Sequence, residues 1–175
     1  MKALPLIASL LLLSSSAAWA DTQSITVHMH KVSAQGVGEE IGTVTLTDSS
    51  GGLLLTPNLK SLSPGPHGFH VHAKGSCDPA PKDGQLSSAE AAGGHLDPGS
   101  TGKHEGPMGQ GHLGDLPALE VGTDGTATAV IRAPRLTIKE VRGGALMIHQ
   151  GGDNYSDTPA KLGGGGPRIA CGVIK

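Results

Sequence analysis

The chain has 175 residues, with 13 basic and 15 acidic side chains, a formal net charge of −2, 28 glycines, nine histidines and two cysteines. This length fits about one domain, and the glycine content argues against a bundle of helices. The sequence has neither a basic stripe nor a cationic amphipathic helix, so we expect no nucleic-acid partner and no membrane partner.

Residues 1–20 have the pattern of a secretory signal peptide. Lys2 supplies a basic start, residues 6–13 are an apolar run, and Ala18-Trp19-Ala20 is an A-x-A cleavage site. The apolar run is too short to span a bilayer, and the pattern predicts export with cleavage before Asp21. Residues 21–175 then form a single domain of about 155 residues, in keeping with the usual domain size. No apolar run in it is long enough to cross a membrane.

Alternation of apolar and polar residues predicts an all-β domain. The candidate strands are 25–30, 40–47, 53–55, 68–72, 118–121, 126–131, 145–149 and 169–174. Asp124-Gly125 predicts a hairpin turn between two of them, and Pro64-Gly65-Pro66 predicts a break before another. Residues 135–140 fit either a strand or a short helical turn. About eight short strands with glycine-rich turns indicate a sandwich or barrel.

The strand 68–72 carries His70-Val71-His72. Because side chains alternate between the two faces of a strand, His70 and His72 point the same way. They can therefore present two imidazoles to one metal ion from a rigid element. The alternative is a pair of surface histidines on a polar strand face.

A glycine-rich loop follows and carries four further candidate ligands. His95, His104, His112 and Asp115 offer three imidazoles and one carboxylate, the usual ligand number for zinc. A loop of some twenty residues is costly to order, and a bound metal would supply that order. A flexible histidine-bearing surface loop is the alternative.

Four histidines lie outside these two segments. His149 ends a strand just before a loop, a common position for a functional residue, although an ordinary strand-end histidine also fits. His28 and His30 form a second H-x-H pair without nearby residues that complete a metal set, so we interpret them as surface residues. We interpret His67 as structural.

Cys77 and Cys171 are the only cysteines. In an exported protein two thiols are expected to pair, because the compartment is oxidising. Such a disulfide would close a loop of about 95 residues and join the loop after His72 to the C-terminal strand. Two free thiols are the alternative.

Several motifs together carry a family resemblance. These are G-F-H-V-H, G-G-H, G-K-H, G-H-L-G-D, I-H and R-I-A-C-G-V-I. As a set they closely resemble copper–zinc superoxide dismutase over nearly all of residues 21–175. T-G-K-H-E-G-P and G-G-G-G-P-R-I-A-C-G-V-I look like the bacterial, periplasmic branch. The resemblance implies an eight-stranded Greek-key barrel or sandwich with long metal-binding and electrostatic loops, located in the periplasm.

The resemblance also implies roles for individual residues. Copper would be held by His70, His72, His95 and His149, and zinc by His95, His104, His112 and Asp115. His95 would then bridge the two metals and move a proton. Arg168 would dock the anionic substrate, and Asp153 would link one histidine of each metal set. Cys77 would pair with Cys171.

The implied reaction is the dismutation of superoxide to oxygen and hydrogen peroxide. Copper would change redox state, which zinc cannot do. Because the net charge is negative and the substrate is an anion, local positive charge would have to steer it. The candidate residues are Lys74, Lys82, Lys103 and Lys161. The short interval from His72 to Cys77 leaves monomer and homodimer both open.

Two other functions fit parts of the pattern. One is a periplasmic metal-binding or copper-storage protein without turnover, which would need no arginine for an anion. The other is a structural β-domain with zinc alone, which would leave His70, His72 and His149 without a role. The complete set of candidate residues favours the enzyme.

Overall fold

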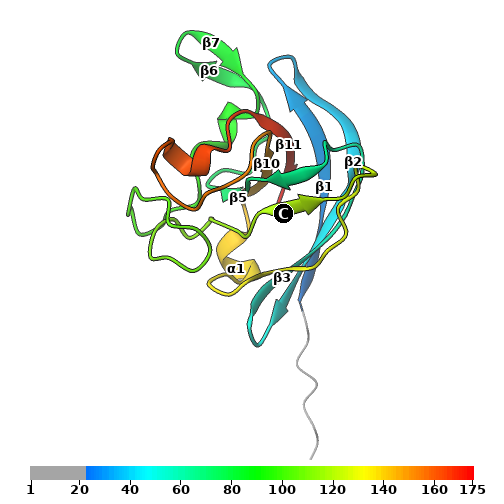
Figure 1. Cartoon of the computed structure of the whole chain (residues 1–175), viewed down its shortest axis with the longest axis vertical. Helices are drawn as coiled ribbons and strands as arrows, with labels where there is room; N and C mark the ends of the chain where they lie inside the picture. The colour runs from blue at the N-terminus through cyan, green and yellow to red at the C-terminus, as the bar shows by residue number, and fades with distance from the viewer. Residues whose placement is uncertain (1–22) are drawn as a thin grey trace, which may run out of the picture.

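The computed structural model describes residues 23–175, so the predicted signal peptide and its cleavage site lie outside the described residues. Seven strands form one curled antiparallel sheet in the order β5-β10-β11-β1-β2-β3-β9 (Figure 1). Their bounds are β1 Ser24–Ser33, β2 Gly36–Ser49, β3 Gly52–Leu59, β5 Phe69–His72, β9 Ile131–Ala133, β10 Ala145–His149 and β11 Arg168–Val173. The predicted all-β fold is thereby confirmed.

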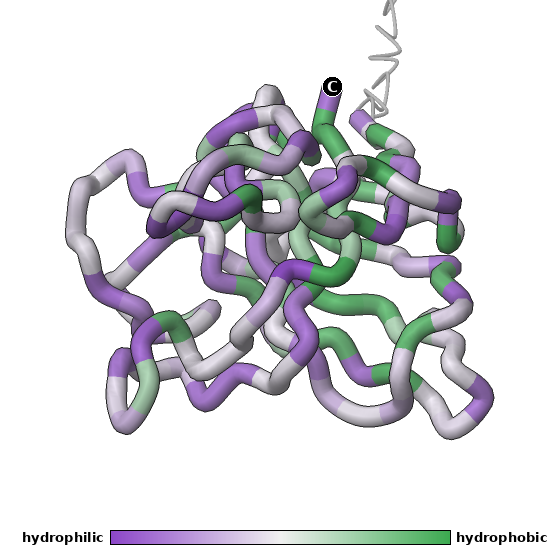
Figure 2. Tube along the Cα trace, turned by 90° about the horizontal axis from the view of Figure 1, so that it is seen from above, coloured by the Kyte–Doolittle hydropathy of each residue, from purple (hydrophilic) through white to green (hydrophobic). Residues whose placement is uncertain are grey.

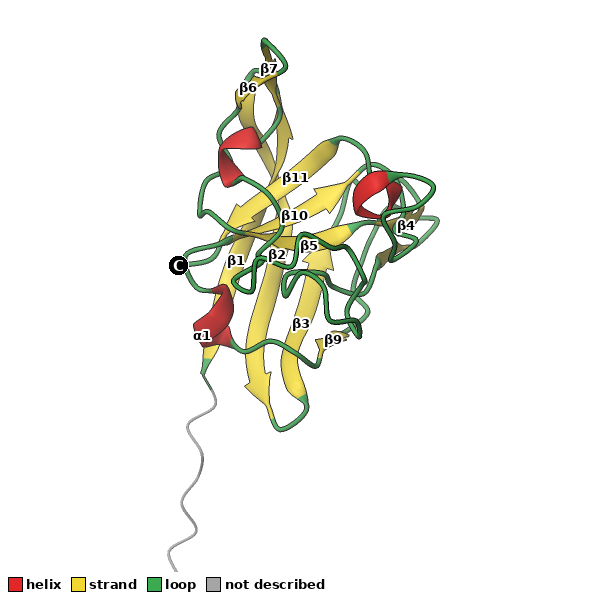
Figure 3. Ribbon diagram, turned by 90° about the vertical axis from the view of Figure 1, so that its left-hand side faces the viewer, coloured by secondary structure: helices red, strands yellow, loops and turns green. Residues whose placement is uncertain are grey.

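Two short strand pairs accompany the main sheet. β4 (Gly65–His67) pairs with β8 (Leu119–Val121), and β6 (Ala80–Lys82) pairs with β7 (Gln85–Ser87). The β6–β7 hairpin extends away from the barrel at one end (Figures 1 and 3). These additions make the strand count differ in detail from the predicted eight, while the Greek-key barrel architecture stands.

In the described part of the chain, helical structure is confined to single turns. One α-helical turn, α1, spans Ile138–Val141, and 3-10 turns span Glu90–Ala92 and Lys161–Gly164. A capping box between Thr137 and Glu140 begins α1. Within residues 23–175, no helix is long and apolar enough to cross a membrane.

Strand β1 shows how the alternating pattern builds the core. Val27 and Met29 are fully buried, whereas His28 between them is exposed. The inward side chains of β1, β2 and β3 pack together with Phe69 into one large apolar cluster. Burial at about 25 cal/mol per Å² of apolar surface makes such a cluster the main source of stability. In Figure 2 the hydrophobic stretches gather on the side of the strands, and the opposite side consists mainly of hydrophilic and neutral loops.

The disulfide closes a second, smaller cluster on the other face of the sheet. Cys77 and Cys171 are bonded, with Cα atoms 5.7 Å apart, as predicted from the export signal. They pack with Met147 and several alanines. The bond ties the loop after β5 to β11, so the loop that leaves the H-V-H strand is anchored to the sheet.

Some local predictions were wrong. Residues 126–131 do not form a strand, because only Ala127 pairs with Leu59 before β9 begins at Ile131. The turn at Asp124-Gly125 forms, but β8 on its N-terminal side pairs with β4 instead of with the residues that follow. Pro66 lies inside β4, and not in a break, since a short strand with one partner tolerates a residue without an N–H.

Candidate metal centre

Strands β5 and β10 position three of the histidines. They pair antiparallel, with Met147 opposite His70 and Ala145 opposite His72. Phe69 and Val71 point into the large core, so His70 and His72 point to the opposite face. His149 follows Met147 by two residues and lies on that same face, at the irregularity where β10 ends. All three imidazoles are buried.

The two ends of the glycine-rich loop bind to the free edge of β5. Val71 accepts a hydrogen bond from Leu96 N at 2.8 Å and donates one to Gly114 O at 2.9 Å. Isolated bridges pair His72 with His95 and His70 with Asp115. This edge pairing is why residues twenty positions apart, His95 and Asp115, both reach the histidines of β5.

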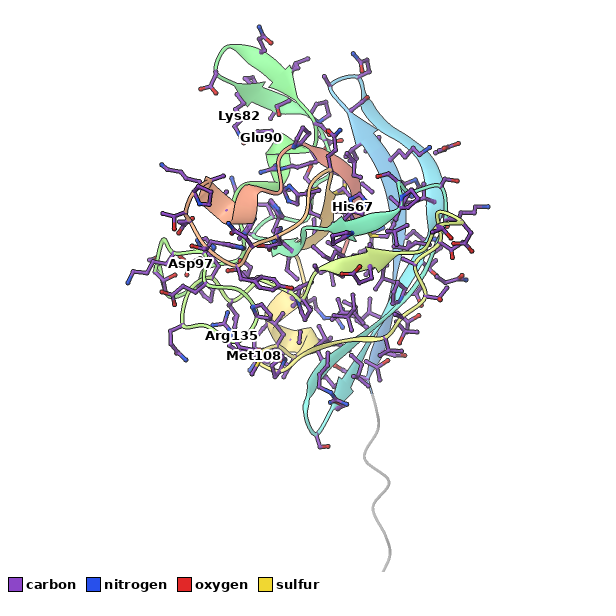
Figure 4. The ribbon with its side chains drawn as sticks, in the orientation of Figure 1. His67, Lys82, Glu90, Asp97, Met108 and Arg135 are labelled. Atoms are coloured by element: carbon purple, nitrogen blue, oxygen red, sulfur yellow. A yellow bond between two sulfur atoms is a disulfide. The ribbon has the colours of Figure 1, made fainter. Side chains whose placement is uncertain are left out.

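Arg135 holds the middle of the same loop. Its guanidinium donates to the main-chain oxygens of Gly109, Gly111 and His112, and Figure 4 places it against this part of the loop. Lys103 O also accepts from His112 N at 2.8 Å. The loop is therefore ordered by backbone contacts and by one half-buried cation.

The side chains gather into two overlapping groups. In one, donor atoms of His70, His72, His95 and His149 lie within 4.8 Å of one another. In the other, donor atoms of His95, His104, His112 and Asp115 do so. His95 belongs to both groups. Its Nδ1 lies 2.9 Å from Asp115 Oδ1, which leaves Nε2 on the side of the other group.

Six imidazole nitrogens in these groups are buried, and four of them have no partner among residues 23–175, whereas His104 Nδ1 and His112 Nδ1 lie 3.0 and 3.4 Å from the Asp115 carboxylate. The six are His70 Nδ1, His72 Nε2, His95 Nε2, His104 Nδ1, His112 Nδ1 and His149 Nε2. An unpaired buried polar atom normally costs about 1–3 kcal/mol, so four such nitrogens in one place, with two more beside a single carboxylate, require an explanation. A metal ion that accepts these lone pairs supplies one. The residues present therefore fit two metal ions, one among imidazoles and one beside a carboxylate.

The opposite nitrogen of most of these rings is held by the protein. His72 Nδ1 bonds to Gly93 O at 2.8 Å, and His149 Nδ1 bonds to Gly166 O at 3.0 Å. Asp153 receives the other two bonds, with Oδ2 accepting from His70 Nε2 and Oδ1 from His104 Nε2, each at 2.8 Å. Such partners fix the tautomer that leaves the remaining nitrogen free for a metal.

The group of His70, His72, His95 and His149 contains imidazoles only, and we call it the imidazole-only group. Burial is the main cause of the pKa shifts of its members. It lowers the pKa of His70, that of His95 to about 4 and that of His149 to about 3. The pKa of His72 is lowered well below its usual range, first by burial and then by the nearby charges of His95 and Arg168. These rings are therefore neutral at pH 7 and ready to donate lone pairs.

In the group that contains Asp115, contacts with carboxylates decide the direction of the pKa shifts. Burial by itself lowers the pKa of His104, but hydrogen bonds from its ring to Asp115 and Asp153 raise it to about 9. Burial raises the pKa of each carboxyl, but the same bonds outweigh it, so both pKa values are lowered far below the usual range. Asp115 and Asp153 therefore stay ionised, which suits a divalent cation.

Arg168 lines a pocket of about 290 Å³ that also includes His72, His95 and His149. Its two terminal nitrogens donate to Ala89 O and Gly93 O, each at 2.7 Å. Burial lowers the pKa of its guanidinium, and the carboxylate of Glu90, 3.4 Å away, opposes that shift. The pocket is lined by His72, His95, His149, Arg168, Lys82, Lys161, Gly94, Leu162 and Gly166. A fixed positive charge therefore faces the space where a small anion can enter.

The four candidate lysines fall into two pairs. Lys82 and Lys161 line this pocket, whereas Lys74 and Lys103 are not among its lining residues. Lys82 is the last residue of β6 before the turn, and its Nζ lies 3.6 Å from Glu90 Oε2; Figure 4 labels the two residues next to each other. Positive charge at the pocket is therefore partly offset by one carboxylate.

The remaining histidines lie outside the two donor groups. His67 is buried and bonds through Nδ1 to His149 O at 2.7 Å and through Nε2 to Ser63 O at 2.8 Å, so it is structural. His28 and His30 lie on the surface side of β1.

Several residues that shape the site were not predicted from the sequence. Arg135 and Glu90 act on partners far away in the chain, and no local motif indicates them. Tyr155 contacts three segments: its N–H donates to Asp153 Oδ1 at 2.8 Å, its hydroxyl accepts from Ala118 N at 3.0 Å, and its ring packs on Gly106. The dipeptide Asp153-Asn154 is the one local signal, because it is good turn sequence.

Comparison with known proteins decides the family. Residues 40–174 match the family model described as copper/zinc superoxide dismutase (SODC). The chain belongs to the copper/zinc superoxide dismutase family. It is 63% identical over 159 residues to superoxide dismutase [Cu-Zn] 2 of Salmonella typhimurium, covering 90% of this chain and 92% of the relative. It is 62% identical over 157 residues to superoxide dismutase [Cu-Zn] of Escherichia coli, covering 89% and 91%.

Similar solved structures support the same family. The Cu/Zn superoxide dismutase from Brucella abortus has 51% sequence identity and a TM-score of 0.86, covering 87% of this chain and all of the solved chain. The monomeric copper, zinc superoxide dismutase from Salmonella enterica has 65% identity and a TM-score of 0.79 over the same shares. This copper/zinc superoxide dismutase converts superoxide to oxygen and hydrogen peroxide, with copper and zinc as cofactors. That activity excludes a storage protein without turnover and a zinc-only structural domain.

Proposed function

We propose that the two donor groups divide the metals between them. Copper is held by His70, His72, His95 and His149, because four imidazoles suit copper. Zinc is held by His95, His104, His112 and Asp115, a set with the usual zinc ligand number and one negative charge. The observation that carries this proposal is the set of six buried imidazole nitrogens, of which four lack a partner in the described chain and two face Asp115, itself a member of the zinc set.

When bound, copper supplies one-electron redox chemistry, and zinc supplies a fixed positive charge that does not change redox state. Substrate binding and proton transfer fall to residues of the protein. Two superoxide ions and two protons yield one oxygen and one hydrogen peroxide molecule, so the site must bind an anion and deliver protons. Arg168 binds the anion, since two main-chain oxygens hold its guanidinium rigidly and the pocket is small.

His95 moves a proton. Its Nδ1 stays beside Asp115, while its Nε2 lies buried on the side of the imidazole-only group and near the pocket. An imidazole nitrogen in that position can take up a proton and release it to the reduced substrate, which is ordinary general acid work. His95 is therefore the bridging residue of our assignment.

Asp153 positions one imidazole of each set, and Lys82 and Lys161 attract the substrate. The carboxylate of Asp153 is fully buried and bonds to both His70 and His104. The two lysines line the pocket, so their charges act where the anion enters. This narrows the steering role to two of the four candidate lysines.

We also propose that residues 1–20 are removed before Asp21 and that residues 21–175 work in the periplasm as a monomer. The A-x-A pattern supports the cleavage site, and the 65% identity to a monomeric Salmonella enterica dismutase supports the monomer. Mass spectrometry and light scattering of the exported protein test both parts. An N-terminus far from Asp21, or a dimer mass, would overturn the corresponding part.

The decisive experiment measures superoxide decay with the mature protein loaded with one copper and one zinc. Rapid decay is expected, and His70→Ala should abolish it together with copper retention. His28→Ala is the matched control, because it removes an exposed histidine from an H-x-H pair on β1. If His70→Ala keeps full copper content and full activity, the copper assignment is wrong.

A further inference from the structure

Strand β1 carries a second H-x-H pair that the metal centre does not use. Thr26, His28 and His30 all line a groove of about 470 Å³ on the outer face of the sheet, beside the disulfide. Three residues at i, i+2 and i+4 in one groove share one face of the strand, as pleating requires. The two imidazoles of this pair are therefore directed into the same open space.

Glu40 on the neighbouring strand can add a third donor, once rotation of the side chains exchanges its contact with His28 Nδ1 for the ion. It pairs with His30 across the β1–β2 ladder, and its Oε1 lies 3.0 Å from His28 Nδ1. The backbone of Glu40 thus lies opposite His30, while its carboxylate contacts His28. A register shift between Met29 and His30 marks a bulge here, and bulges re-aim side chains.

The rings keep one nitrogen for a ligand. Among residues 23–175, His28 and His30 make their hydrogen bonds through Nδ1, to Glu40 and to Gly38 O at 3.3 Å respectively. That leaves Nε2 of each ring. The side chains of His28 and Glu40 are 61% and 46% exposed, so both can rotate without disturbing the core.

We propose that His28, His30 and Glu40 form a third metal-binding site, which takes a divalent transition-metal ion and prefers Cu(II) to Zn(II). Two imidazoles and one carboxylate are three ligands that suit both ions, and the remaining positions stay open to water. The preference follows the general affinity order of first-row divalent metals. This site is separate from the interior centre and does not depend on its ligand assignment.

The interior H-x-H pair shows that this spacing can bring donors together. His70 and His72 on β5 have ring centroids 6.5 Å apart, and their donor atoms still lie within 4.8 Å of one another. His28 and His30 have the same i, i+2 spacing on a strand of the same sheet. Rotation of the exposed His28 side chain toward the half-buried His30 can produce the same convergence at the surface.

Local charge favours a cation. Lys31 is occupied by Glu39, with 2.6 Å between Nζ and Oε1, so it does not oppose a metal at Glu40. Asp78 and Lys175 also line the groove and carry opposite charges. The other charges nearby cancel in pairs, so Glu40 supplies the net negative charge.

The test uses mature protein whose interior sites are already filled with one copper and one zinc. Calorimetric titration with Cu(II) should show a third equivalent bound, and electron paramagnetic resonance should show a second copper signal. His28→Ala/His30→Ala should lose both. Glu40→Gln should bind about tenfold more weakly or worse, since losing a charged ligand costs at least as much as losing a hydrogen-bonding partner of a ligand.

Glu39→Gln is the matched control, because it removes the neighbouring carboxylate, which contacts Lys31 and neither histidine. It should bind the third equivalent normally. Superoxide dismutation should be unchanged in all these variants. The proposal fails if the wild type takes up no third equivalent, or if the double histidine variant takes it up with equal affinity. It also fails if Glu39→Gln weakens binding as much as Glu40→Gln.

Discussion

Replacing Asp153 by asparagine should weaken copper retention more than zinc retention. The two carboxylate oxygens of Asp153 are not equivalent. Among residues 23–175, Oδ1 accepts from both His104 Nε2 and Tyr155 N, whereas Oδ2 accepts from His70 Nε2 alone. An asparagine has one oxygen, and it should occupy the Oδ1 position, where two donors need an acceptor.

The amide nitrogen of that asparagine then faces His70 Nε2. Two N–H donors cannot bond to each other, so His70 must move its proton to Nδ1, the nitrogen that we assign to copper. Loss of such a partner typically costs 10–100-fold in metal affinity. That is about 1.4–2.7 kcal/mol, which agrees with the roughly 1.5–3 kcal/mol of one hydrogen bond to a charged group.

Competition with a chelator, followed by measurement of both metals, provides the assay. Copper affinity of the Asp153→Asn variant should fall by about 10–100-fold, and zinc affinity by less. Asp124→Asn is the control, because Asp124 only closes a turn with Thr126. An equal loss of the two metals, or a larger loss of zinc, would show that the two oxygens do not divide the histidines in this way.

Three further predictions concern the surroundings of the site. Reduction of the Cys77–Cys171 bond, which spans 94 positions, should cost about 4 kcal/mol and lower Tm by roughly 10 °C; a calorimetric shift below about 2 °C contradicts this. Arg135→Met should lower zinc affinity by about tenfold, since three loop carbonyls lose a charged donor, whereas Arg132→Met should not. Glu90→Gln should speed superoxide decay by roughly twofold at low salt; a slower rate would mean that Glu90 orients Arg168.

The parts of the fold that follow from local pattern were predictable. In β1, alternation alone identifies Val27 and Met29 as buried, because the strand has one face on the core. Residues 126–131 also alternate, but no neighbouring strand is available to them beyond the single bridge at Ala127. The alternating pattern indicates which residues favour a strand. Whether they pair depends on neighbours that are distant in sequence, which the pattern does not identify. The helical turn at Ile138–Val141 was one of two readings, and Thr137 with Glu140 decides it.

The candidate site was predictable where residue type carries chemistry. Histidines and Asp115 stand out because few other roles require so many imidazoles in one loop. Arg135 and Glu90 could not be found in this way. Arg135 bonds to main-chain oxygens, which every residue possesses, so its partners leave no trace in the sequence. Glu90 is one of several acidic loop residues until the fold brings it 3.4 Å from Arg168.

The position of Tyr155 has an optical consequence. Trp19 and Tyr155 are the only tryptophan and tyrosine, and Trp19 lies in the segment that we expect to be removed. Export should therefore replace indole emission by the weaker emission of a single phenol. That phenol connects the loop of Asp153 to Gly106 and Ala118. Its fluorescence in the mature protein thus serves as a built-in signal for closure of the two loops around the metals, without any added label.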